Sequence, residues 1–369
     1  MRPQIRAGHL LWALLIGEIL REGAFHAIEA LVRSRARRVL GVGRSFGDDA
    51  LAYFTERLNV SRIREALGGA IRRAKRNKAF DGVRFIGLAL DGTGAARCTE
   101  RKATCPWCVP FANADHEVIG HHHRFSLISV VGTGLVLPVD AEPYGPGDCE
   151  VKASERVLRR AVQILGPRFA DYLVVDGEYA RAPFLHVAGD LGLHVVVRLK
   201  GNVPELYAVA QARFTHQPPA TTFGDGRDQV EIWDADDFDP WSTLNWPTVR
   251  VIRYRQHKPD GTTVEAYWLT DFPSASVGSR AVYRMAKSRW EIENGGFNDG
   301  KNRHGLEQIR HHHPNSLVVG WLIVCLALVL ERLYRLRYLH RGGRPARTAI
   351  ELVRALRLSL GTGSAQDTS

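Results

Sequence analysis

Two short apolar runs, each ending in an Asp-Gly pair, constrain the fold of this chain more than any other feature. The first covers residues 85–90 and leads to Asp91, and the second covers residues 172–175 and leads to Asp176. Runs of this length are typical of buried strands, and α/β sheets place their sites where such strands end. We therefore expect both carboxylates at one edge of a sheet, although each Asp-Gly pair taken alone is a common turn.

The segments around the second aspartate predict a mixed sheet with helices on its faces. Residues 126–131 and 135–139 are strand-like and are joined by Gly-Thr-Gly, which predicts a hairpin. Residues 150–165 and 182–191 have the apolar spacing of amphipathic helices, and residues 194–199 form another strand-like run. This order of strands and helices indicates the α/β class.

A third acidic candidate lies on a helix predicted over residues 280–294. Arg289 and Glu293 are four residues apart and share one helix face, whereas Glu291 points away from them. The glycine pair at 295–296 is expected to loosen or end this helix. An Arg-Glu pair at this spacing is usually a surface ion pair. Together with the two aspartates, however, Glu293 would complete an oxygen-ligand set for a divalent metal ion.

The peptides LDGT, VDG and RWEIEN, which contain Asp91, Asp176 and Glu293, resemble the three signature segments of DDE transposases of bacterial insertion sequences. The resemblance extends over about residues 80–310. It implies a ribonuclease H-like catalytic core in which these three residues are catalytic and bind Mg²⁺ or Mn²⁺. In such sites two metal ions activate the attacking hydroxyl and stabilise the leaving oxygen at phosphorus.

In one branch of that family the third segment reads Tyr-x2-Arg-x3-Glu-x6-Lys, and this sequence departs from it at both ends. Arg289 and the glutamate match, but the tyrosine position holds Ala286, with Tyr283 one helical turn earlier, and Lys301 lies one residue too far along. The resemblance implies DNA contacts from Arg289, Tyr283 and Lys301. Trp290 is a candidate for stacking on an unpaired base, with packing against the sheet as the alternative.

The net charge of +11 is unevenly distributed along the chain. Residues 1–80 contain 16 Lys and Arg against 7 Asp and Glu, a balance of +9, and residues 301–369 contain 11 against 4, a balance of +7. The middle, residues 81–300, carries −5. An acidic centre between basic flanks favours metal chemistry in the middle and polyanion binding on both sides; solvated helix faces are the alternative.

These features predict three regions. Residues 1–80 are expected to be a helical, basic DNA-binding region, and residues 81–310 a ribonuclease H-like mixed sheet flanked by helices. A β-rich insertion at about 202–278 precedes the third acidic segment. Residues 311–369 are expected to be a basic helical region with a disordered tail.

Three of the five cysteines, Cys98, Cys105 and Cys108, lie within eleven residues. A Cys-x2-Cys pair followed by histidines is typical of zinc sites, so these residues and His116 are a candidate structural Zn²⁺ site. A reduced loop beside exposed histidines is the alternative. The odd number of cysteines fits a reducing compartment rather than a disulfide framework.

The chain is expected to be cytoplasmic, and nucleoid-associated when bound to DNA in a bacterium. Its longest apolar run, residues 317–330, is short for a membrane span, and the N-terminus lacks a signal-peptide pattern. The resemblance implies the terminal inverted repeats of a mobile element and target DNA as partners, with a dimer in the synaptic complex.

The sequence therefore predicts a DNA transposase that cuts at element ends and joins the freed 3′-hydroxyl to target DNA. Two alternatives stay open. One is another metal-dependent DNA nuclease on the same core, and the other is a transposase-derived DNA-binding protein without catalysis.

Overall fold

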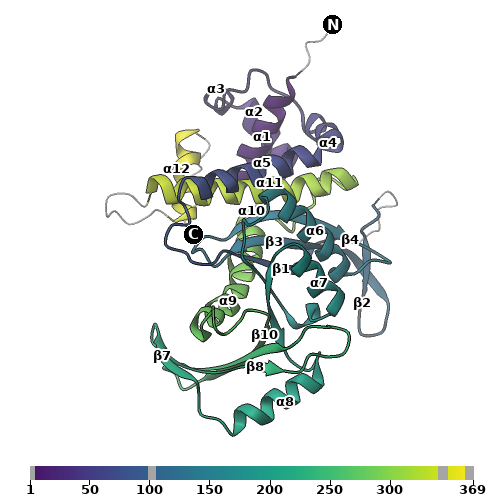
Figure 1. Ribbon diagram of the computed structural model, residues 1–369. Coiled ribbons are helices and arrows are strands. Elements are labelled where there is room, and N and C mark those ends of the chain that lie inside the picture. Colours follow the sequence, from purple (N-terminus) through teal and green to yellow (C-terminus); the bar gives the residue numbers. More distant parts are fainter. Residues whose placement is uncertain (1–4, 99–104, 340–347, 362–369) are drawn as a thin grey trace.

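A single mixed sheet runs through the molecule (Figure 1). The computed structural model describes residues 5–98, 105–339 and 348–361, and in these ranges the sheet has ten strands in the order β2-β3-β1-β5-β6-β10-β9-β8-β7, with β4 also paired to β3. Strands β1, β5 and β6 are parallel, and β3 is antiparallel to β1. The bounds of this first group are β1 (Gly87–Cys98), β2 (Val109–Ala112), β3 (Val118–Val131), β4 (Leu137–Tyr144), β5 (Tyr172–Val175) and β6 (His194–Leu199).

The insertion before the third acidic segment extends this sheet. Strand β10 pairs antiparallel with β6, so β7 to β10 continue the central sheet instead of forming one of their own. Helix α8, which the sequence pattern did not predict, opens the insertion. Its elements are α8 (Pro204–Thr215), β7 (Thr221–Asp225), β8 (Asp228–Phe238), β9 (Val249–His257) and β10 (Thr263–Thr270).

Helices cover both faces of the central strands. Successive residues of β3 point to opposite faces: Phe125 stacks on Trp321 of α11 at 4.5 Å between ring centroids, whereas the Ser126 hydroxyl bonds the Ser154 hydroxyl of α6 at 2.7 Å. Helices α6 (Glu150–Leu165) and α7 (Ala182–Asp190) lie on one face. The other face carries α9 (Ser279–Glu291), the π-helix η2 (Ile292–Asn298), α10 (Asp299–His304) and α11 (Pro314–Tyr334). The predicted mixed sheet flanked by helices is confirmed.

The N-terminal helices share a hydrophobic core with α11. Leu14 and Ile28 from the N-terminal side are buried against Val319 and Leu322 of α11. The helical segment Pro314–Leu339, which comprises α11 and the turn after it, is long and apolar enough to cross a membrane. However, 78% of its most apolar 18-residue stretch is buried inside the protein, as in a core helix. The remaining helices are α1 (Ala7–Ile19), α2 (Phe25–Arg33), α3 (Ala36–Val39), α4 (Asp48–Arg57), α5 (Val60–Arg76), η1 (Gly177–Tyr179), η3 (Arg335–Leu339) and α12 (Ala349–Ser359).

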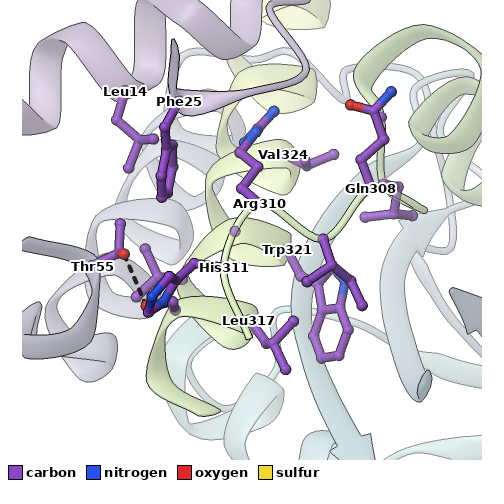
Figure 2. Close-up of a pocket in the computed structure, with 15 residues that line it drawn as sticks. Leu14, Phe25, Thr55, Gln308, Arg310, His311, Leu317, Trp321 and Val324 are labelled. Carbon is purple, nitrogen blue, oxygen red and sulfur yellow. Dashed lines mark hydrogen bonds between the residues drawn. The ribbon is translucent and has the colours of Figure 1, made fainter. Parts of the chain in front are cut away.

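Polar contacts reinforce this junction (Figure 2). The Thr55 hydroxyl donates to the Ser316 hydroxyl over 2.9 Å, which ties α4 to the start of α11. Arg310 reaches back to the N-terminal helices, where it pairs with the buried Glu18 and donates to the Gly23 carbonyl. A small pocket lies here, and its lining residues, all in the described part of the chain, do not include any of the three predicted acidic residues.

The tail expected to be disordered lies, from residue 362 on, outside the described residues.

Candidate active site

The register of the central strands brings Asp91 beside Asp176. Strands β1 and β5 pair in parallel up to Ala89 and Val174. Asp91 and Asp176 each follow two residues after this last pair, so continuing the register would set them side by side. The side chain of Tyr172 points toward α9, because its hydroxyl lies 2.9 Å from that of Ser288. Since side chains alternate along a strand, Asp176 lies on that same face of the sheet.

One expectation about Asp91 was wrong. Its strand does not end there: β1 continues to Cys98, paired with β3, and Asp91 lies just beyond the last residue paired with β5. The sequence pattern indicated a strand end because apolar residues stop at Asp91. Up to Ala89 the strand lies between β3 and β5 in the centre of the sheet, where buried side chains are apolar. Beyond that point it pairs with β3 alone, and the apolar run stops.

Arg289 joins the third acidic residue to the first. Its guanidinium lies 2.5 Å from Oε1 of Glu293 and 3.4 Å from Oδ2 of Asp91. Arg289 is only 8% exposed, so this pairing is largely removed from water. The same guanidinium also helps to lower the pKa of Asp176. Asp91 and Glu293 therefore pair with one buried positive charge, whose electrostatic influence extends to Asp176.

The two aspartates have opposite pKa shifts. Burial raises the pKa of Asp91 to about 7; Arg289 opposes this rise, and the nearby carboxylates of Glu150 and Glu293 add to it. Burial also acts on Asp176, but the Gly177 N–H and the Lys200 ammonium outweigh it and hold the pKa below its ordinary value. Carboxylates whose environments push their pKa values apart are typical of functional sites.

Glu293 lies on the π-helix η2. Helices of this form are rare in proteins as a whole, but those that occur are often found at functional sites. The glycine pair loosens the helix, as expected, but does not end it, because η2 runs on into α10. A Cβ on Gly295 would stand 2.8 Å from Val136 Cγ2, so this glycine permits the close approach of η2 to the β3–β4 hairpin. Arg332 of α11 fixes that position through the Gly295 and Val136 carbonyls.

Glu150 lies directly behind Asp91. It is the first residue of α6, and a Cβ on Gly92 would overlap its carboxylate, so a larger residue after Asp91 would displace Glu150. The hydroxyls of Tyr179 and Tyr144 donate to Glu150 over 2.7 and 3.2 Å. The Asp-Gly pair at the first strand is therefore more than a turn signal, since its glycine makes room for a fourth carboxylate.

Lys200 is a site residue that sequence reasoning missed. It follows β6, and its Nζ lies 3.0 Å from Oδ2 of Asp176. Asn202 supports the same turn, because its side-chain amide donates to the Gly177 carbonyl over 2.5 Å. The sequence signal for it is that Lys200 directly follows a third apolar strand, which ends at the same edge of the sheet as β5.

The other residues of the RWEIEN peptide point in different directions. Glu291 accepts a hydrogen bond of 2.9 Å from the Gly132 N–H, which follows β3 beside the start of β1, and thus lies away from the acidic group as expected. Trp290 is 47% exposed and lies 4.6 Å from the Arg289 guanidinium carbon, so it is not packed against the sheet.

Two of the residues predicted to contact DNA are engaged within the protein. Tyr283 of α9 is 2% exposed, and its hydroxyl donates to Asp225 of the insertion over 2.8 Å. Its side chain therefore packs at the contact between α9 and the insertion. This burial removes the basis for a DNA contact by Tyr283. Lys301 pairs with Glu307 over 3.0 Å. The π-helix between Glu293 and Lys301 accommodates an additional residue, which accounts for the longer spacing.

The three clustered cysteines do come together, but with a different histidine. Nε2 of His123 lies 3.1 Å from the Cys105 sulfur and 3.5 Å from that of Cys108. His116, the histidine chosen from the sequence, is exposed in the β2–β3 turn with φ 64. The candidate set is therefore corrected from His116 to His123.

The acidic group fits a divalent cation by its chemistry. Its donors are carboxylate oxygens, which Mg²⁺ and Mn²⁺ prefer. Asp91 and Glu293 share the guanidinium of Arg289, and the pKa of Asp91 is raised, chiefly by burial and further by the negative charges of Glu150 and Glu293. A bound cation would supply that compensation.

Comparison with known proteins identifies the family. The family model described as "Transposase DDE domain" matches residues 85–330, more than half of the chain. Among solved structures, the cryo-EM structure of the piggyBac transposase synaptic complex with hairpin DNA matches with a TM-score of 0.46 and 12% identity, over 96% of this chain and 70% of that one. No match among the curated proteins was found. The chain belongs to the DDE transposase domain family.

Proposed function

We propose that this protein is the DNA transposase of an insertion sequence, which cleaves at the ends of its element and transfers the 3′-hydroxyl into target DNA. The observation that carries the proposal is the grouping of Asp91 and Glu293 around Arg289, with Asp176 in register beside Asp91. The family assignment supports the same reaction class.

In this proposal Asp91, Asp176 and Glu293 hold divalent metal, Mg²⁺ or Mn²⁺. The bound metal supplies Lewis-acid chemistry that activates the attacking hydroxyl and stabilises the leaving oxygen. Glu150, whose carboxylate occupies the space that a side chain at position 92 would take, is proposed to support Asp91 from behind. Glu150 is itself oriented by two tyrosine hydroxyls.

Arg289 and Lys200 are proposed to hold phosphate oxygens of the DNA. Each now neutralises a carboxylate of the site, Arg289 at Asp91 and Lys200 at Asp176. Arginine presents two parallel N–H donors that match a phosphate, and lysine provides a compact charge. Trp290 offers an exposed ring beside Arg289 on which an unpaired base can stack.

The basic flanks are proposed to supply most of the affinity for DNA. Residues 1–80 carry +9, and three arginines near the end of α5, which we call the basic edge, are partly or fully exposed: Arg72, Arg73 and Arg76. Lys75 lies between them but donates to the Phe169 carbonyl over 2.6 Å, so we leave it out. Binding to the terminal inverted repeats, a dimer in the synaptic complex and a cytoplasmic, nucleoid-associated location belong to the same proposal.

The test is a matched pair of substitutions on one helix. Glu293→Gln removes a proposed metal ligand, whereas Glu291→Gln changes an identical side chain two residues away that faces Gly132. The assay is Mg²⁺-dependent cleavage and joining of DNA that carries the inverted repeats flanking the gene. Gel-shift binding to the same DNA is measured in parallel.

We expect Glu293→Gln to abolish cleavage while binding is retained, and Glu291→Gln to keep both. Equal activity of wild type and Glu293→Gln would overturn the assigned site. Cleavage without joining by the wild type would indicate a nuclease instead of a transposase. Binding without any cleavage by the wild type would indicate a protein that has lost catalysis.

A further inference from the structure

A second group of metal-ligating side chains lies away from the acidic site, at the far end of β1. Cys98, Cys108 and His123 each place a ligand atom within 4.8 Å of the other two. Cys105 adjoins them, with its sulfur 3.1 Å from Nε2 of His123. Cys105, Cys108 and His123 are at most 2% exposed. Two buried sulfurs, those of Cys105 and Cys108, thus meet the buried imidazole of His123, and the partly exposed sulfur of Cys98 lies beside Cys108 and His123.

The distances approach those of a tetrahedral zinc site. Zinc bonds of about 2.3 Å to sulfur and 2.0 Å to nitrogen, at the tetrahedral angle, separate sulfur and nitrogen ligands by about 3.5 Å. The sulfurs of Cys105 and Cys108 lie 3.1 and 3.5 Å from Nε2 of His123. The four donors come from a Cys-x2-Cys turn and two neighbouring strands, an arrangement common to structural zinc sites.

A β-bulge places Cys98 on the correct face. The pairing of β1 with β3 shifts between Ala95 and Arg97, so that Cys98 is opposite His121 while Ala95 is opposite His123. Residues opposite each other share a face, and His121 and His123 share one because they are two apart. Without the extra residue in the bulge, Cys98 would point to the other side of the sheet.

We propose that Cys98, Cys105, Cys108 and His123 bind one structural Zn²⁺ ion, which is separate from the metal of the acidic site. Thiolates and imidazole are zinc ligands, whereas the acidic site offers only carboxylate oxygens. Two buried thiols beside a buried imidazole have no comparable role in a simple apolar core, which aliphatic side chains would fill better.

The zinc ion would fix the strand that carries the first catalytic aspartate. Asp91 and Cys98 lie on the same strand, and the zinc would fasten its far end to β3 and to the start of β2. The ring of His123 also lies 6.1 Å from that of His312, in the segment that leads into α11. Metal loss is therefore expected to loosen β2 and the end of β1, without removing any carboxylate.

The experiment measures metal in the purified full-length protein after dialysis against a mild chelator. We expect about one zinc per chain by elemental analysis, with X-ray absorption showing three sulfur ligands and one nitrogen. Cobalt(II) replacing the zinc should give the absorption bands of a tetrahedral thiolate site. Because Asp91→Asn/Asp176→Asn alters only the acidic site, this double variant should keep its zinc.

Matched variants separate this site from other thiols and histidines. Cys105→Ser/Cys108→Ser and His123→Ala should lose the zinc, and hydrogen exchange should then quicken in β2 and at the end of β1. Cys149→Ser, which removes an exposed cysteine, and His116→Asn, which keeps a residue tolerant of positive φ, should retain the zinc.

Several results would overturn the proposal. They are wild-type protein without zinc after preparation in zinc-containing medium, a ligand set dominated by oxygen, or zinc lost from Asp91→Asn/Asp176→Asn but kept in His123→Ala. If the cysteine variants do not fold, absorption spectra of the cobalt-loaded wild type still decide whether sulfur ligands are present.

Discussion

Replacing Asp91 by asparagine is expected to stabilise the metal-free protein at alkaline pH. The folded-state pKa of Asp91 is raised from 3.8 to about 7, so the folded chain binds a proton more tightly than the unfolded chain does. Stability is therefore lost as pH rises from about 4 to 7 and stays reduced above it. Each pKa unit corresponds to about 1.4 kcal/mol, so the ionised carboxylate destabilises the fold by up to about 4 kcal/mol at pH 8.

Asp91→Asn removes this charge while Arg289 keeps its bond to Glu293. With an unfolding entropy of about 2.1 cal/mol/K per residue, a gain of 4 kcal/mol corresponds to a rise in Tm of about 5 °C for this chain. The gain should shrink to about 2 kcal/mol at pH 5 and vanish below pH 4. Thermal unfolding in chelator, recorded across this pH range, measures it.

Asp148→Asn provides a control of opposite sign. The bonds from Arg156 and the Cys149 N–H outweigh burial and lower the pKa of Asp148, so its removal should destabilise the protein at pH 8 and matter less as pH falls through the folded pKa. Adding Mg²⁺ should stabilise the wild type and leave Asp91→Asn unchanged. The reasoning is refuted if Asp91→Asn lowers Tm at pH 8, or if its effect does not depend on pH.

Three further outcomes are expected. Gly92→Ala should displace Glu150, reduce single-turnover cleavage at least about tenfold and lower the free energy of unfolding by about 1–3 kcal/mol; normal cleavage would contradict the role of this glycine. Neutralising the basic edge should flatten the slope of log affinity against log salt by about 2.7, at 0.9 per phosphate contact; an unchanged slope would mean a solvated helix face. Trp290→Ala should weaken binding to DNA with an unpaired base by about 1–3 kcal/mol without altering the free energy of unfolding. As the buried comparison, Trp321→Ala, at a position 3% exposed, should lower the free energy of unfolding by about 3–5 kcal/mol.

Local sequence pattern was sufficient for most elements of the core. Helix α6 and strand β6 have the predicted bounds, because amphipathic and fully apolar runs report directly on burial. Pattern failed where neighbours in space decide the outcome. The extension of β1 beyond Asp91 depends on β3, and the union of the insertion with the central sheet depends on β6.

The candidate site was likewise only partly predictable. Arg289 and Glu293 could be paired from their spacing, since a helix fixes which residues share a face. Lys200 could not, because its place beside Asp176 depends on how the parallel strands are arranged in the sheet. His116 is nearest to the cysteines along the chain, but β3 pairing brings His123 to them instead.

The central claim, that one divalent metal site is built from three distant segments, is tested most directly by metal-directed cleavage of the protein itself. Iron(II) substituted for Mg²⁺, with ascorbate and peroxide, generates radicals that cut the backbone close to the metal. The account predicts cuts around Asp91, Asp176 and Glu293 together, suppressed by excess Mg²⁺ and absent from Asp176→Asn. Cuts confined to one of these segments, or unaffected by Mg²⁺ and by Asp176→Asn, would contradict it.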